Sequence, residues 1–223
     1  MSARPDFPED GAGPRWFGLY PALVVDLVDP DGKGRIKVKF PSFGQAGENV
    51  TAWATLLSPY ADKDQGFQVL PEVDSQVVVG FEAGDPTRPY IVGACWNGQR
   101  ALPESAERAN AKRTWKSRAG SLIQFDDTPG AAKVTVSMKS GHKIVLDDAA
   151  QDISIEHSNG CKIELDIAGR VNVTANASVE VTASAVNLHA PTVMCDGIVQ
   201  CTTLIATGGV VSPSYTPGAG NVW

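Results

Sequence analysis

The chain has 223 residues, of which 43% are hydrophobic, and carries 19 basic against 25 acidic side chains, for a formal net charge of −6. This length predicts one or two domains with enough apolar content for a packed core. Neither half of the chain is basic, so we do not expect a surface built for a nucleic-acid backbone. The 22 glycines and 15 prolines are spread along the chain and favour many short strands over long helices.

The first elements indicate a small barrel. Residues 1–15 are rich in Pro, Gly and Asp and are predicted to form an N-terminal arm. Across residues 16–98, segments of strand character alternate with turns such as the one at residues 29–34, where Pro and Gly supply the bend. Such closely spaced short strands are typical of a closed barrel of the OB-fold type. The expected strands lie within residues 19–29, 35–40, 50–57, 76–82 and 89–96.

A polar segment follows the predicted barrel. Residues 99–118 are predicted to be a linker, with one helical turn near residues 104–112. We expect its basic side chains to be solvated or to dock onto a neighbouring acidic surface, and an anion site is the alternative. These side chains are Lys112, Arg113, Lys116 and Arg118.

From residue 119 the sequence repeats itself. Segments that begin at Ala119, Ser140 and Asn159 share a Gly turn, an alternating strand and an acidic turn. The strands between them, residues 133–139 and 152–158, complete a series of β-hairpins. From residue 171 the period shortens to eight residues, with a stripe of Val and Ala separated by small polar residues.

An eight-residue unit is a single strand and a turn, too short to enclose a core within one chain. Three chains wound about one axis can enclose it, each supplying one face of a triangular prism. The predicted fold class is therefore all-β, with the N-terminal OB-fold barrel followed by a C-terminal trimeric intertwined β-helix, or needle, over residues 119–211. The side chains expected in the trimer core are Val171, Val173, Val179 and Val181.

The end of the chain is predicted to be a tip. Residues 212–223 are too rich in Gly and Pro for a regular strand. The expected tip contacts are Tyr215, Pro217 and Trp223.

Residues 18–41, residues 58–98, the hairpin repeats and the final segment resemble the phage baseplate assembly protein V and VgrG-type spike family, especially the short central spikes of extracellular contractile injection systems. The resemblance implies a homotrimer with a baseplate hub protein at the barrel end, a PAAR-type tip protein at the C-terminal end and possible effector cargo. No hub domain precedes the barrel, so a separate hub chain is implied. The chain has no lysozyme-like insert either, so peptidoglycan cleavage is not expected.

The predicted function is structural: a central spike that pierces a target envelope and nucleates baseplate assembly. The chain lacks an apolar run of about 18 residues and a signal-peptide pattern. We therefore expect it to be made in the cytoplasm and assembled into an injection particle or virion-like tail that is delivered across the target envelope. The four cysteines are expected to be reduced thiols.

Other kinds of chemistry were weighed against this interpretation. The Asp126–Asp127 and Asp147–Asp148 doublets suggest a β-helical tailspike glycan hydrolase, the alternative function, but each doublet precedes turn residues and is expected to cap the backbone. A third class, an OB-type binder of single-stranded nucleic acid, would use Trp53, Tyr60 and Phe67, which we expect to fill the barrel or the seam with other subunits.

No cofactor and no metal are expected. Three copies of His189 could meet on a trimer axis, but residue 187 is Asn, so the His-x-His pair of some related spikes is absent. Cys195 and Cys201 are six residues apart and match no zinc-ligand spacing. His142 shares its repeat position with Ser121 and Cys161, which indicates a surface position of the repeat.

Overall fold

The computed structural model describes residues 15–44 and 49–213. In these residues the chain is all-β, as predicted, and its one helical element is a 3₁₀ turn, η1 (Glu82–Gly84). None of the described residues forms a helix long and apolar enough to cross a membrane. The chain divides into two compact units, Met1–Asn176 and Ala177–Trp223, which are described separately.

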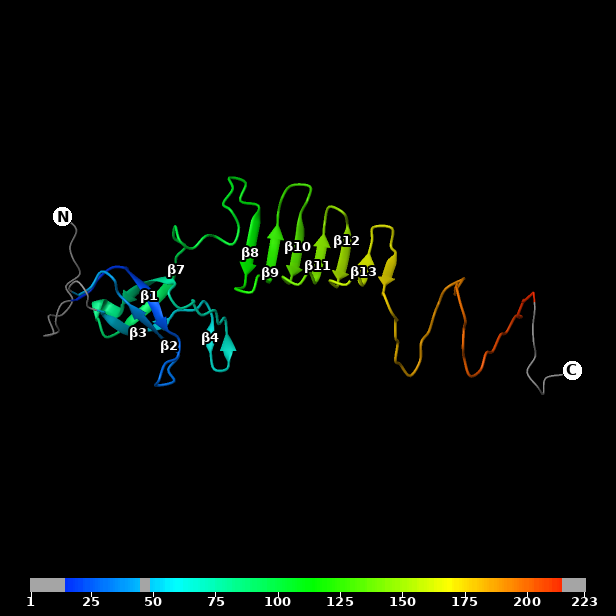
Figure 1. Ribbon diagram of the computed structural model, residues 1–223, viewed down its shortest axis with the longest axis horizontal. Helices are drawn as coiled ribbons and strands as arrows, with labels where there is room; N and C mark the ends of the chain where they lie inside the picture. Colours follow the sequence, from blue (N-terminus) through cyan, green and yellow to red (C-terminus); the bar gives the residue numbers. More distant parts are fainter. Residues whose placement is uncertain (1–14, 45–48, 214–223) are drawn as a thin grey trace. The chain divides into compact units, whose positions relative to one another are not determined.

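Five strands close a barrel in the order β1-β2-β3-β7-β6, as the sequence predicts (Figure 1). Strand β1 (Tyr20–Asp26) pairs antiparallel with both β2 (Arg35–Lys39) and β6 (Gln76–Phe81). Strand β3 (Thr51–Leu56) pairs antiparallel with β2 and parallel with β7 (Pro89–Ala94), and β6 pairs with β7 to complete the closure.

The barrel core follows from the alternation of its strands. Ile36 and Val38 on β2 point inward and are at most 1% exposed, whereas the basic side chains between them face outward. Covering one such side chain stabilises the fold by about 1.5–3 kcal/mol. The buried core consists of Ala22, Val24, Ile36, Val38, Phe40, Ala54, Val77, Val79 and Ile91.

Three aromatic side chains expected to fill the barrel or a subunit seam lie outside the barrel core. Trp53 faces outward on β3, with the guanidinium of Arg35 and the ammonium of Lys37 each 5.9 Å from its ring. Tyr60 and Phe67 flank a short hairpin, β4 (Ala61–Asp62) and β5 (Gln65–Gly66), and are half exposed. They do not fill the barrel, because Trp53 faces outward and the loop holds Tyr60 and Phe67 away from the core. The alternative, that they line a seam with other subunits, stays a prediction.

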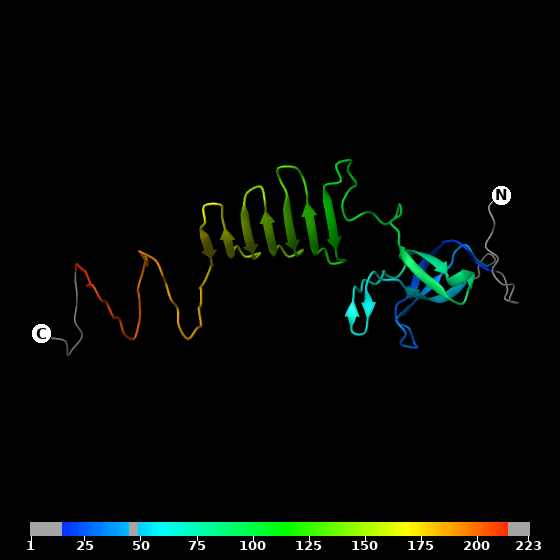
Figure 2. The same ribbon diagram turned by 180° about the vertical axis from the view of Figure 1, so that it is seen from behind.

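The second sheet has seven strands, and each pairs antiparallel with the next in the sequence (Figures 1 and 2). We call this sheet the ladder. Its strands are β8 (Lys112–Lys116), β9 (Leu122–Asp126), β10 (Lys133–Ser137), β11 (Lys143–Asp147), β12 (Asp152–Glu156), β13 (Lys162–Leu165) and β14 (Val171–Thr174).

The ladder corrects the predicted linker in two respects. Residues 112–116 form β8, whose five residues all pair with β9, from Lys112 opposite Asp126 to Lys116 opposite Leu122. The helical turn predicted near residues 104–112 is wrong, because these residues form bends, a turn and the start of β8. The strand was not recognised because three of its five residues are basic, which is typical of a solvated segment.

The turns of the ladder explain the aligned glycines and aspartates. Gly120, Gly141 and Gly160 have φ values of +88°, +98° and +94°, which L side chains rarely adopt. At the opposite ends of the strands, carboxylates accept backbone N–H groups, as when Thr128 N donates to Asp126 over 3.0 Å and Ala150 N donates to Asp147 over 2.9 Å. The interpretation of these aspartates as turn caps is confirmed.

The second unit contains no strand in its described residues, 177–213 (Figure 2). The β-helix was predicted to continue to residue 211, but the strands of the single chain end at Thr174. Here Val179 and Val181 are 65% and 70% exposed. The predicted arm and tip fall almost entirely outside the described residues.

Candidate functional site

The ladder has one apolar face, built by strand register. Residues directly opposite one another in antiparallel strands share a face, and so do residues two apart along a strand. One row across the ladder consists of Trp115, Ile123, Val136, Ile144, Ile155, Ile163 and Val173. The adjacent row consists of Arg113, Phe125, Val134, Leu146, Ile153, Leu165 and Val171. Arg113 is the one polar member, and we call these two rows the apolar face.

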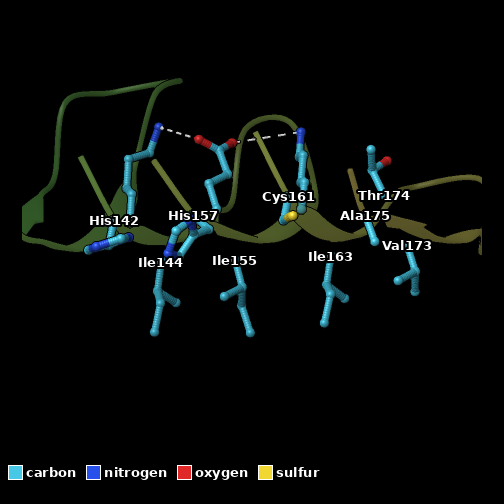
Figure 3. A pocket seen from close by; sticks show the side chains of 12 residues that line it. His142, Ile144, Ile155, His157, Cys161, Ile163, Val173, Thr174 and Ala175 are labelled. Carbon is cyan, nitrogen blue, oxygen red and sulfur yellow. Dashed lines mark ion pairs between the residues drawn. The ribbon is translucent and has the colours of Figure 1, made fainter. Parts of the chain in front are cut away.

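The apolar face is uncovered in the single chain. Its exposed side chains range from 38% for Val136 to 65% for Val171. Figure 3 shows Ile144, Ile155, Ile163 and Val173 extending side by side from the same side of the sheet. A contiguous apolar surface of this kind marks an interaction site, because soluble monomers rarely leave one open to water.

The opposite face of the ladder is polar and internally paired. The carboxylate of Glu156 lies 3.5 Å from the ammonium of Lys143 and 3.7 Å from that of Lys162, the ion pairs drawn as dashed lines in Figure 3. Lys162 also donates to Glu164 over 2.9 Å, and this hydrogen bond raises the pKa of Lys162. Such exposed pairs contribute little each, but they mark the face that remains in water.

An open depression of about 480 Å³ lies at the glycine-turn end of the apolar face, between Ile144, Ile155, Ile163 and neighbouring side chains (Figure 3). The rings of His142 and His157 are in contact there, with centroids 4.3 Å apart and planes tilted by 46°. Nδ1 of His142 accepts from Ser158 N over 3.3 Å, and Nδ1 of His157 accepts from Asn159 N over 3.2 Å. Each Nδ1 atom is therefore already occupied by a backbone N–H group.

No metal cluster is found in residues 15–44 and 49–213, where no three His, Cys, Asp or Glu side chains come together as ligands. His189, Cys195 and Cys201 are all exposed and lie in the second unit.

The aspartate doublets serve the turns. The hydroxyl of Thr128 donates to Asp126 and holds the pKa of that carboxyl below its ordinary value. Asp127 pairs with Arg113 at 2.7 Å. A glycan hydrolase needs one carboxyl with a raised pKa to act as general acid, and the shift at Asp126 runs in the opposite direction.

The predicted site residues fall into three places. Val171 and Val173 lie on the apolar face, at its last strand, whereas Val179 and Val181 lie in the second unit outside any strand. The tip residues Tyr215, Pro217 and Trp223 lie outside the described residues. Sequence reasoning placed the core stripe from residue 171 onward and missed the longer part of the face on β9–β13. The signal was present in the aligned isoleucines of the hairpin repeats.

Comparisons with known proteins agree with this architecture. Residues 20–96 match the family described as the Type VI secretion system/phage-baseplate injector OB domain. The chain is 26% identical over 161 residues to the Type VI secretion system spike protein VgrG5 of Pseudomonas aeruginosa, an alignment that covers 67% of this chain and 19% of the relative. It is 26% identical over 154 residues to the spike protein VgrG1a of the same organism, covering 63% and 24%.

A third relative, the actin cross-linking toxin VgrG1 of Vibrio cholerae, is 22% identical over 184 residues, which are 76% of this chain and 16% of the toxin. The chain thus spans about a fifth of the length of the curated relatives it matches. The closed five-stranded barrel coincides with the matched segment. Residues 20–96 thus form a closed barrel that matches the injector OB domain, and the chain is similar to VgrG-type spike proteins.

Proposed function

We propose that this chain is the central spike of a phage-tail-like baseplate or contractile injection machine and acts as a homotrimer without catalytic activity of its own. The observation that carries the proposal is the apolar face. It exposes apolar side chains along all seven strands of the ladder, opposite a face of paired charges. In the proposed trimer the three apolar faces line the interior of a prism.

The energetics favour association. About half of each side chain on the apolar face remains in contact with water, so covering it contributes roughly 1 kcal/mol, on the order of 10 kcal/mol per chain before the cost of association. Three sheets arranged about an axis cover all three apolar faces and leave the charged faces outside. Val171, Val173, Val179 and Val181 belong to this core in the proposal.

The mechanical role and partners extend the proposal. Two of the similar proteins are Type VI secretion system spike proteins, which supports a spike role here. In the proposal, a trimeric prism of paired strands supplies the stiffness for passage through an envelope. We place a hub protein at the barrel and a PAAR-type protein beyond residue 211, with Tyr215, Pro217 and Trp223 as contacts. Effector cargo and nucleation of baseplate assembly belong to the same proposal. The proposal also includes a close relationship to the short spikes of extracellular injection systems.

The oligomeric mass of the full chain, measured by light scattering after size-exclusion chromatography, tests the proposal. We expect a species of three times 23.5 kDa that does not dissociate on dilution. A monomer of 23.5 kDa would overturn the trimeric spike and return attention to a single-chain hydrolase. A dimer would also contradict the prism, because two sheets would then cover each other face to face.

A further inference from the structure

We infer that the apolar face of the ladder is the surface on which copies of this chain first meet, and that residues 177–213 acquire their structure only after the ladders have associated. The inference rests on the proposed function and assigns an order and a location to the self-association. Its occupant is a second copy of the same ladder.

Apart from the outer edges of β8 and β14, the strands of the ladder pair their backbones within one chain. Each strand pairs with its neighbour in sequence, and the connecting turns close through short hydrogen bonds such as Gly141 N to Met138 O at 3.0 Å. Sheets built from consecutive hairpins form from local contacts and therefore form quickly. Most of its backbone is therefore paired without a second copy, and its largest unpartnered surface is the apolar face.

The segment 177–213 is in the opposite situation. It has no strand pairing of its own, and Val179, Val181 and Leu188 are 65–70% exposed. An isolated extended segment would lose its conformational entropy on ordering while gaining neither backbone hydrogen bonds nor apolar burial. It can gain both only where other copies of the segment already lie close by, so it cannot start the association.

The character of the apolar face favours a second copy as its occupant. The face presents no unpaired charge, because its one charged member, Arg113, is held by Asp127 at 2.7 Å. Its Ile, Leu and Val side chains lie directly opposite one another on successive strands, so two identical sheets can interdigitate. The chain also runs from β14 directly into the Val/Ala stripe of the next residues. A covering chain must match both parts in that order, as another copy does.

The test uses three single substitutions in the full chain. Ile155→Lys places a charge on the apolar face at a side chain that is 48% exposed in the single chain, so the ladder itself tolerates it. Val181→Lys places the same charge in the second unit, on a side chain that is 70% exposed. Asn172→Lys is the matched control, because it adds a lysine at an exposed position on the opposite face of β14.

We expect I155K to lose the three-chain mass and elute as a monomer with its β-sheet circular dichroism retained. V181K should keep the three-chain mass, while limited proteolysis within residues 177–213 becomes at least tenfold faster. N172K should match the wild type in both measurements. A V181K monomer, or an I155K trimer as stable as the wild type, would overturn the inference.

A measurement on the unmodified chain keeps the inference testable if I155K fails to fold. During refolding from denaturant, pulsed hydrogen exchange should show the ladder amides protected first. Residues 177–213 should follow at a rate that rises with chain concentration. Simultaneous protection of both units would contradict the order. A wild-type chain that stays monomeric throughout would instead overturn the proposed function, so the two failures are distinguishable.

Discussion

The carboxylate of Asp29 organises the turn between β1 and β2. Its side chain is only 2% exposed and receives the Nε of Arg35 at 2.8 Å and the Nη2 of the same guanidinium at 2.9 Å. The backbone N–H groups of Asp31 and Lys33 donate to it as well, over 3.0 Å and 3.1 Å. The hydrogen bond from Arg35 is the largest cause that holds the pKa of Asp29 well below its ordinary range. The carboxylates of Asp29 and Asp31 therefore both form ion pairs with the guanidinium of Arg35.

Replacing Asp29 by Asn should lower the thermal midpoint of the barrel. It should also make that midpoint depend less on pH in the acidic range. The folded-state pKa of Asp29 is depressed, so its contribution to stability is fully present above the unfolded value of about 3.9 and is lost as the pH falls below it. The wild type should lose stability as the pH drops from about 5 towards 2, and D29N should lose less over that interval. Thermal melts followed by circular dichroism at several pH values measure the difference. Asp62→Asn on the exposed β4–β5 hairpin is the control and should leave the acid response unchanged.

At the scale of elements, the ladder depends on turns that only glycine accommodates without strain. Gly141 sits at φ +98°, and a Cβ added there would lie 3.4 Å from Cβ of Ser158 in the neighbouring turn. A left-handed backbone costs an L-residue about 1–2 kcal/mol. The three aligned glycines of the hairpin repeats thus favour the reversals after β8, β10 and β12.

Gly141→Ala should therefore destabilise the protein by about 1–2 kcal/mol and lower its thermal midpoint by a few degrees. Gly98→Ala is the control, because that glycine has no positive φ and nothing within 4 Å of an added Cβ. Equal midpoints for the two variants in differential scanning calorimetry would show that the turn at Gly141 is not strained by a side chain.

The sequence allowed most elements to be predicted, for physical reasons that differ between regions. Strand β2 was recognisable because Ile36 and Val38 alternate with basic residues, and hairpin repeats were recognisable because glycines and aspartates recur at fixed spacing. Strand β8 was missed because it carries three basic side chains in five residues. The strands predicted for the trimer beyond Thr174 do not form in residues 177–213 of the single chain, because a strand needs a paired backbone and one chain offers none there.

At the scale of the whole molecule, one chain is an incomplete structure. Its barrel buries a core of its own, whereas the ladder turns its apolar side chains outward, and the second unit buries almost nothing in its described residues. Apolar burial thus decreases from a self-sufficient barrel to a second unit that, in the proposed trimer, is covered only by other copies. The structural changes that we expect on assembly therefore fall mainly in the C-terminal part of the sequence.

Exchange of subunits between assembled trimers should accordingly be very slow. If residues 177–213 wind about their copies, a chain can leave only after that segment unwinds, so dissociation follows the rate of unfolding rather than the equilibrium affinity. Trimers labelled separately with donor and acceptor dyes should show no energy transfer after a day of mixing at 25 °C. V181K trimers should exchange at least tenfold faster, because a charge in the stripe weakens the winding without touching the ladder. Rapid exchange in the wild type would mean that the chains lie side by side without interlocking, and that the ladder faces alone hold the spike together.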